Sequence, residues 1–243
     1  MNTMRASPIG AEIEKIGPEH PWAGYYYFGD KLAINLYLAI APQSGYAFEW
    51  HGCLGKYGQG EGKILDTNAP LRLSGNVFAL FSEMHSSNSI VIPVRWGERR
   101  YLIPSGDMIE FCNAVNAGTE PRSSLARGYF YLKEGDEDKK CAGDPPVPKE
   151  FKKFLLQSPV SATITKVLST PNGTNGFFAT SALVNAGSKQ GLIPGMKLHV
   201  IYPNAFEEAI VKRTEAEQCE VEFEQLSEDR LPQEGWKVST RLR

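Results

Sequence analysis

The chain has 243 residues, of which 42% are hydrophobic and 11% aromatic, enough for one large packed core or two modest ones. Charged residues make up 22% of the chain, and the formal net charge is only −2. This near-balance argues against a nucleic-acid-binding protein that neutralises phosphates. It also argues against a strongly basic membrane-surface protein.

No apolar run approaches the roughly 18 residues that span a bilayer, so the sequence predicts no transmembrane segment. Residues 1–10 carry one arginine and no apolar stretch of the kind found in signal peptides. These two features favour a cytoplasmic protein, unless an export segment precedes this numbering.

The spacing of the cysteines does not match that of a metal site. The four cysteines are widely spaced and include no CxxC pair: Cys53, Cys112, Cys141 and Cys219. An even number permits disulfides without implying them. Structural zinc sites usually bring two ligands on one short loop, so we predict no metal, and no motif predicts a cofactor.

In the first part of the chain, short apolar segments are separated by turn residues, a pattern typical of an antiparallel β-protein. A short helix is expected at residues 11–16, and apolar side chains then alternate through residues 32–41, which predicts a strand. Gly58, Gly60 and Gly62 recur at period two and would share one face of a strand beneath bulky neighbours.

Further short elements continue this pattern. Strands are expected at 63–65, 71–73, 77–81 and 128–133, a hairpin at 89–103 and a helix at 107–114. Residues 20–140 are therefore predicted to form an antiparallel meander or barrel.

Residues 141–158 are predicted to be a Pro-rich linker followed by a short helix. Phe151, Phe154 and Leu155 would give that helix, at 149–157, one apolar face. Residues 159–243 return to five or six short strands, which suit a small barrel of the SH3 or OB type. Within them, residues 183–198 predict a strand, a sharp turn built on three glycines and a proline, and another strand.

The predicted fold class is thus mainly β, with a meander or barrel followed by a smaller barrel and few short helices. Residues 162–241 resemble β-modules of bacterial envelope proteins, namely the β-domain of the rod-shape cell-wall scaffold and the C-terminal module of a flagellar assembly factor. The residues that carry this resemblance are Asn185-Ala186-Gly187-Ser188, Gly191-Leu192 and Pro194-Gly195-Met196. It implies a bacterial adaptor or assembly protein and brings no catalytic residues with it. It also makes a periplasmic or envelope-associated location the alternative to the cytoplasmic one.

A second resemblance covers residues 21–73. They are similar to the opening of a lipocalin-like meander through Trp22-Ala23-Gly24-Tyr25 and the amphipathic strands that follow. This resemblance implies a barrel and names no ligand.

The sharpest polar cluster lies in the predicted hairpin. Its candidate ligand-binding residues are Arg95, Trp96, Arg99, Arg100 and Tyr101. Arginine can clamp a carboxylate or phosphate in bidentate fashion and aromatic rings can stack, so the cluster could hold an anionic ligand at a barrel rim. The alternative is a hairpin with Glu98 at its tip, whose arginines pair with nearby acids.

Two sequence patterns contain residue types that can support catalysis. In Trp50-His51-Gly52-Cys53 an imidazole and a thiol lie close together. The simpler interpretation has Trp50 packing inward, His51 pointing outward and Cys53 buried beside a turn. A hydrolase would instead need two facing carboxylates among the scattered Asp30, Glu49, Asp66, Glu83 and Asp107. No catalytic residue is assigned.

The leading hypothesis is a non-enzymatic binding or assembly protein. Its first barrel would hold a small apolar or anionic ligand, or be filled by its own side chains, and its second module would contact a protein partner. No nucleic-acid partner is expected. The alternatives are a hydrolase with its site in the first domain and a purely structural protein.

Overall fold

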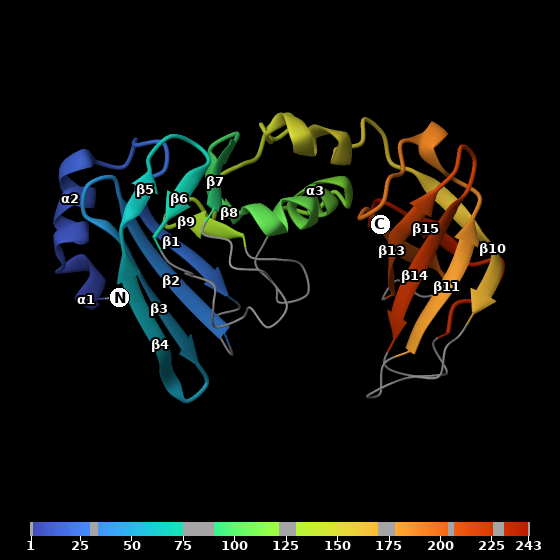
Figure 1. The fold of residues 1–243 in the computed structure, drawn as a ribbon, viewed down its shortest axis with the longest axis horizontal. Helices are drawn as coiled ribbons and strands as arrows, with labels where there is room; N and C mark the ends of the chain where they lie inside the picture. Colours follow the sequence, from blue (N-terminus) through green and yellow to red (C-terminus); the bar gives the residue numbers. More distant parts are fainter. Residues whose placement is uncertain are drawn as a thin grey trace. The chain divides into compact units, whose positions relative to one another are not determined.

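The computed structural model describes residues 2–29, 34–74, 90–121, 130–169, 178–203, 207–225 and 231–242. The protein is mainly β with few short helices, as predicted (Figure 1). The chain forms two compact units that interleave in sequence. The first comprises Met1–Phe111 and Pro121–Pro148, and the second comprises Cys112–Glu120 and Lys149–Arg243. The predicted division into 20–140, 141–158 and 159–243 is consecutive in sequence, whereas Cys112–Glu120 groups here with the second unit.

The first unit contains one sheet of nine antiparallel strands. They are β1 (Gly24–Gly29), β2 (Ile34–Ala41), β3 (Gly45–Gly52), β4 (Gly55–Gly62), β5 (Ile64–Asp66), β6 (Leu71–Leu73), β7 (Ile90–Trp96), β8 (Arg99–Pro104) and β9 (Tyr131–Lys133). Their order is β4-β3-β2-β1-β9-β8-β7-β6-β5, so the first strand pairs with the last. The two edge strands, β4 and β5, are separated in sequence by Lys63 alone, which makes the sheet a nearly closed barrel. The strand predicted at 77–81 lies outside the described residues.

Alternate side chains of strand β2 pack into two different apolar clusters, one on each face of the sheet. This confirms the predicted strand, in which alternate residues share a face. One face contributes Leu36, Leu38 and Ile40 to the core inside the sheet. The other places Ala39 and Ala41 against Ile9 and Ile13 of a helix.

That helix is α2 (Pro8–Ile16), preceded by the short α1 (Asn2–Arg5). It begins three residues earlier than expected because Pro8 fits the first helical turn and the Ser7 side chain accepts the Gly10 amide hydrogen.

Large side chains pack the space inside the nine-stranded sheet. The cluster contains Trp22, Ala23, Tyr26, Phe28, Leu36, Leu38, Ile40, Tyr46, Leu71, Leu73, Val91, Leu102 and Tyr131. Barrels of about this size have an interior just wide enough for side chains to fill. The expectation of a ligand inside the first barrel therefore gains no support from these residues.

The glycines of β4 lie opposite aromatic residues of β3, as predicted. Gly60 pairs with Phe48, and Gly58 and Gly62 pair with Trp50 and Tyr46. A Cβ on Gly60 would lie 2.5 Å from the Phe48 ring. Glycine at these positions makes room for the aromatic rings of the neighbouring strand.

Residues 142–148 form no helix or strand, as the linker prediction implied, but they pack on the first unit. The indole nitrogen of Trp96 donates to the Gly143 carbonyl at 2.6 Å, and the Glu98 amide donates to the Lys140 carbonyl at 3.1 Å. Val147 is buried. Two backbone carbonyls in and just before this irregular segment thus accept hydrogen bonds from the β7–β8 hairpin.

The second unit is a closed barrel of six antiparallel strands in the order β10-β11-β14-β13-β12-β15. They are β10 (Ser161–Ser169), β11 (Phe178–Val184), β12 (Lys197–Tyr202), β13 (Glu208–Thr214), β14 (Cys219–Gln225) and β15 (Lys237–Ser239). The predicted sharp turn between β11 and β12 contains the 3-10 helix η4 (Ser188–Gln190). Gly191 and Gly195 there have φ values of 87° and 93°, which favour glycine.

Helix α3 (Met108–Asn116) follows the 3-10 helix η2 (Ser105–Asp107), close to the predicted helix at 107–114. In the second unit, the Asn116 side chain donates to the Phe154 carbonyl and accepts the Leu156 amide hydrogen. The amphipathic helix predicted at 149–157 is instead the six-residue 3-10 helix η3 (Lys149–Phe154). At its end, the Phe154 carbonyl and the Leu156 amide are bonded to the Asn116 side chain, so these two groups are not available to a further helical turn.

Candidate functional site

The predicted arginine cluster lies in the β7–β8 hairpin, and most of it is buried. Arg99 is 2% exposed, Arg100 7% and Tyr101 1%, whereas Arg95 is exposed. Trp96 is half-buried and bonded to Gly143. The cluster therefore presents one exposed arginine to solvent.

Both buried arginines bind acceptors of the chain itself. Arg100 Nε and Nη2 donate to the two carboxylate oxygens of Asp136 at 2.9 and 2.8 Å, and its Nη1 donates to the Pro18 carbonyl. Arg99 donates to the carbonyls of Lys139 and Glu137 at 2.5 and 2.7 Å. The bidentate carboxylate expected from a ligand is the chain's own Asp136.

A buried lysine lies beside Arg100. Arg100 and Lys133 share the inner face of β8 and β9 with the core residues Leu102 and Tyr131, since each is two residues away along its strand. The Lys133 Nζ donates to the carbonyls of Ala23, Pro18 and His20 at 2.7, 3.1 and 3.4 Å.

These groups form an end-cap cluster, which we define as Arg100, Lys133, Asp136 and the carbonyls of residues 18–23. Burial, together with the neighbouring charge of Arg100, lowers the pKa of Lys133 to about 8. Burial alone would raise the pKa of Asp136, but hydrogen bonds from Arg100 and Lys139 outweigh it and the pKa lies below its usual value. The end-cap cluster fastens the loop between α2 and β1 over one end of the sheet.

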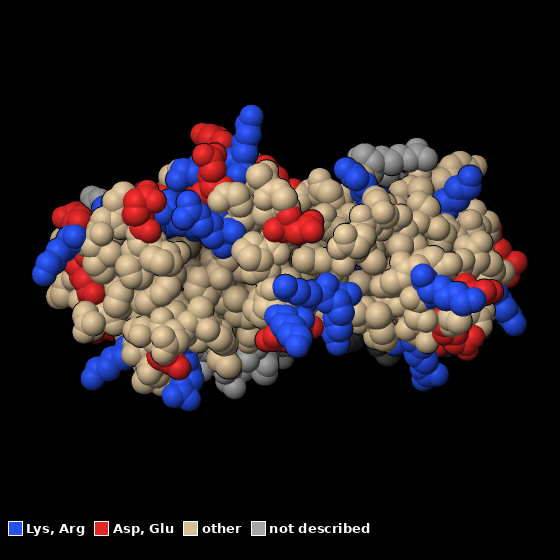
Figure 2. Space-filling model, turned by 90° about the horizontal axis from the view of Figure 1, so that it is seen from above, with Lys and Arg blue, Asp and Glu red and all other residues tan. Residues whose placement is uncertain are grey.

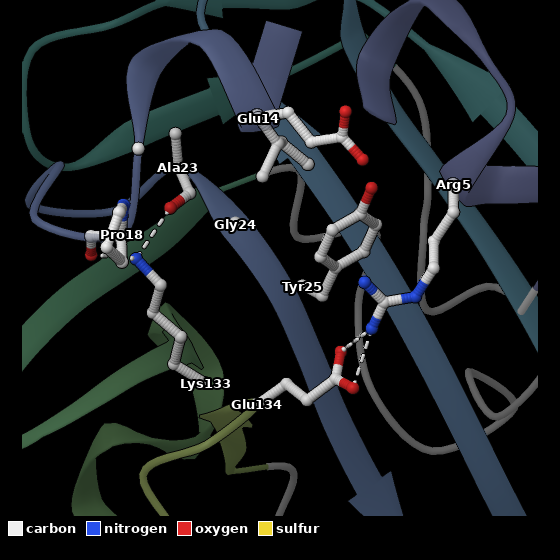
Figure 3. A pocket seen from close by; sticks show the side chains of 10 residues that line it. Arg5, Glu14, Pro18, Ala23, Gly24, Tyr25, Lys133 and Glu134 are labelled. Atoms are coloured by element: carbon white, nitrogen blue, oxygen red, sulfur yellow. Dashed lines mark hydrogen bonds and ion pairs between the residues drawn. The ribbon is translucent and has the colours of Figure 1, made fainter. Parts of the chain in front are cut away.

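A pocket of about 300 Å³ lies beside this cluster (Figure 3). Its walls come from α1, α2, the loop that follows α2, the start of β1 and the end of β9. Ile13, Ala23 and the Tyr25 ring supply apolar surface, and the floor includes Gly24. Gly24 has a φ of 150°, and a Cβ there would lie 2.6 Å from Lys133 Cε, so glycine allows the lysine to cross the strand.

The charged groups at the mouth of the pocket are mostly paired. Arg5 Nη2 lies 2.7 Å from both carboxylate oxygens of Glu134, and the Arg5 guanidinium lies 4.4 Å above the Tyr25 ring. The oxygens of the Glu14 carboxylate and the Tyr25 hydroxyl point toward each other (Figure 3). The Tyr25 hydroxyl oxygen is buried, and no described residue gives it a hydrogen bond.

Sequence reasoning did not find this pocket. Its residues come from four separate segments, around positions 5, 13–18, 23–25 and 133–134. The one available signal was Lys133, a charged residue directly after apolar strand positions and so a candidate for a buried ammonium.

The histidine and the thiol at 51 and 53 have different surroundings. His51 Nε2 lies 3.0 Å from Glu49 Oε2, and its ring packs edge-on against Tyr37 at 5.6 Å. Trp50 packs against the core, as expected. The expectation that Cys53 is buried is wrong, because it lies exposed in the turn that projects between β3 and β4. None of the four cysteines forms a disulfide.

The described members of this carboxylate set, Glu49, Asp66 and Asp107, are not among the residues that line the pocket. Glu49 lies on β3 beside His51, and Asp66 on β5 accepts the Asn68 amide hydrogen at 2.9 Å. Asp107 is buried in η2. Asp30 and Glu83 lie outside the described residues. Over the part of the chain that the structure describes, no group of three or more His, Cys, Asp or Glu is placed to hold a metal ion.

The surface charges and the helices of the described residues point to no particular type of binding partner. Acidic and basic side chains are interspersed over the face shown in Figure 2. Among the described residues, no helix combines the length and the apolar character that a bilayer crossing requires.

Comparison of the chain with protein-family models, curated proteins and solved structures found no match.

Proposed function

We propose that the protein is a non-enzymatic small-ligand-binding protein, and that its site is the pocket beside the end-cap cluster. One observation carries this proposal: a pocket of about 300 Å³, lined in part by apolar groups, is bordered by Tyr25, whose buried hydroxyl has no hydrogen bond to any described residue. Ligand sites commonly pair apolar walls with a few polar groups, and this volume falls at the lower end of their range.

The structure favours binding over catalysis at this pocket. The Lys133 ammonium is directed at three backbone carbonyls, and the Arg5 guanidinium is directed at Glu134. Neither group is placed as a free nucleophile or acid. Contact of the second unit with a protein partner stays a prediction.

The test uses the full chain and a variant with a filled pocket. Native mass spectrometry of freshly purified protein would detect a retained ligand, and a thermal-shift screen of small molecules would detect added ones. Glu14→Trp places a large ring at the mouth of the pocket, and Lys15→Trp is the matched control because Lys15 does not line it. We expect Glu14→Trp alone to lose the ligand responses. A Glu14→Trp variant that keeps every response of the parent would refute the pocket as the site.

A further inference from the structure

Two polar groups on the pocket wall are left without partners among the described residues. They are the exposed carboxylate of Glu14 on α2 and the buried hydroxyl of Tyr25 on β1. Figure 3 shows them on the same side of the pocket, with their oxygens toward each other. Both can accept hydrogen bonds from a ligand, and only one of them carries a charge.

The two cationic side chains that line the pocket, Arg5 and Lys133, already form hydrogen bonds with other groups of the chain. Arg5 pairs with both oxygens of Glu134 and covers one face of the Tyr25 ring. The Lys133 Nζ has three donors and three carbonyl partners. Among the charged side chains that line the pocket, the one without a hydrogen bond to a described residue is therefore the Glu14 carboxylate.

The phenol of Tyr25 stays neutral at physiological pH. Burial raises its pKa above the ordinary value; the Arg5 charge opposes this shift, and Glu14 and Glu134 add to it. A neutral phenol oxygen next to a carboxylate presents two acceptor groups at one end of the pocket.

We propose that the ligand of this pocket carries a primary ammonium group next to a small apolar body. The ammonium would donate to the Glu14 carboxylate and to the Tyr25 hydroxyl oxygen, and the apolar body would lie against Ile13 and Ala23. This inference rests on the proposed function, since it names the ligand class of the same pocket.

Other head groups fit less well. A carboxylate or phosphate would meet the Glu14 charge and would find Arg5 and Lys133 already bonded. A quaternary ammonium has no N–H to donate to the two acceptors, and Arg5 already covers one face of the Tyr25 ring.

The experiment compares three probes of similar shape at pH 7 by isothermal titration calorimetry on the full chain. They are 2-phenylethylamine, 2-phenylethanol and 3-phenylpropionate, which carry a cationic, a neutral and an anionic head group. The amine should bind most tightly. Glu14→Gln, which keeps the side-chain shape, and Tyr25→Phe should each weaken amine binding, Glu14→Gln by about tenfold, the size of one charge-assisted hydrogen bond. Lys15→Gln should leave it unchanged.

Each other outcome overturns the inference. Equal or tighter binding of the alcohol or the acid would refute the ammonium class while leaving a ligand pocket in place. Unchanged amine affinity in Glu14→Gln would refute the role of the carboxylate. Absence of binding by all three probes would also overturn the ammonium class, and the Glu14→Trp screen would then decide separately whether the pocket binds ligands.

Discussion

Gly187, at the turn after β11, is a position where one methyl group should destabilise the second unit. Its φ is −150°, which any residue can adopt, so the effect of Gly187→Ala would be steric. The added Cβ would lie 2.3 Å from the Glu215 carbonyl oxygen and 2.7 Å from the Gln218 backbone nitrogen and oxygen. These are backbone atoms, which cannot rotate away as the end of a side chain can.

The size of the destabilisation follows from the displacement of the 215–218 segment that the added Cβ requires. Overpacking of this kind costs about 1–3 kcal/mol. Displacing the 215–218 segment also weakens the bonds from the Ser188 amide to the Glu215 carbonyl, 2.8 Å, and from the Lys189 amide to the Ala216 carbonyl, 2.9 Å. Each such bond is worth about 0.5–1.5 kcal/mol. We expect Gly187→Ala to lower the free energy of unfolding of the second unit by about 3 kcal/mol.

Region-resolved hydrogen exchange is the suitable assay, because a two-unit chain need not unfold in one transition. Amides in β10–β15 should lose roughly 100-fold in protection, and amides in β1–β9 should serve as the internal reference. The control is Gly235→Ala, where φ is 88° and no atom lies within 4 Å of the added Cβ. Only backbone strain of about 1–2 kcal/mol applies there. A smaller loss for Gly187→Ala than for Gly235→Ala would refute the steric argument.

Three further predictions concern the first unit. Asp136→Asn should destabilise it by about 3–5 kcal/mol in chemical denaturation, because Arg100 keeps a buried charge. The pKa of Asp136 is lower when folded, so this loss should be full above pH 3.8 and shrink as the pH falls below it; a loss independent of pH would contradict the ion pair. The pKa of Lys133 is about 8 when folded and 10.5 otherwise, so the unfolded chain binds more protons between these values. Parent stability should therefore rise relative to Lys133→Met as the pH increases from 8 to 10, and a falling difference would contradict the lowered pKa. Gly60→Val should cost about 1–3 kcal/mol in thermal unfolding through contact with the Phe48 ring, and an unchanged melting temperature would show that the ring can move aside.

Local patterns predicted the strands well. Apolar side chains at period two in β2 identified both of its faces, and glycines at period two in β4 identified aromatic neighbours. The hairpin around Trp96 also formed where it was expected. These features depend on residues close in sequence, where strand geometry alone decides which side chains share a face.

The candidate site could not be predicted in the same way. Arg100 and Asp136 are joined only because β8 pairs with β9, and the pocket exists only because α2 returns to the start of β1. A bidentate arginine has the same sequence signature whether its carboxylate belongs to a ligand or to the chain. The helix at 149–157 failed for a related reason, since Asn116 lies far from it in sequence.

The pairing of the first strand with the last sets an order of events during synthesis on the ribosome. Strand β1 emerges first, but its second neighbour, β9, is made after every other strand of the sheet. Tyr26 cannot meet Lys133 before residue 133 has emerged. Until then β1 has an open edge, a condition that exposes nascent chains to wrong pairing. Because Lys133 also binds the loop at 18–23, completion of the sheet and fastening of that loop belong to one late step.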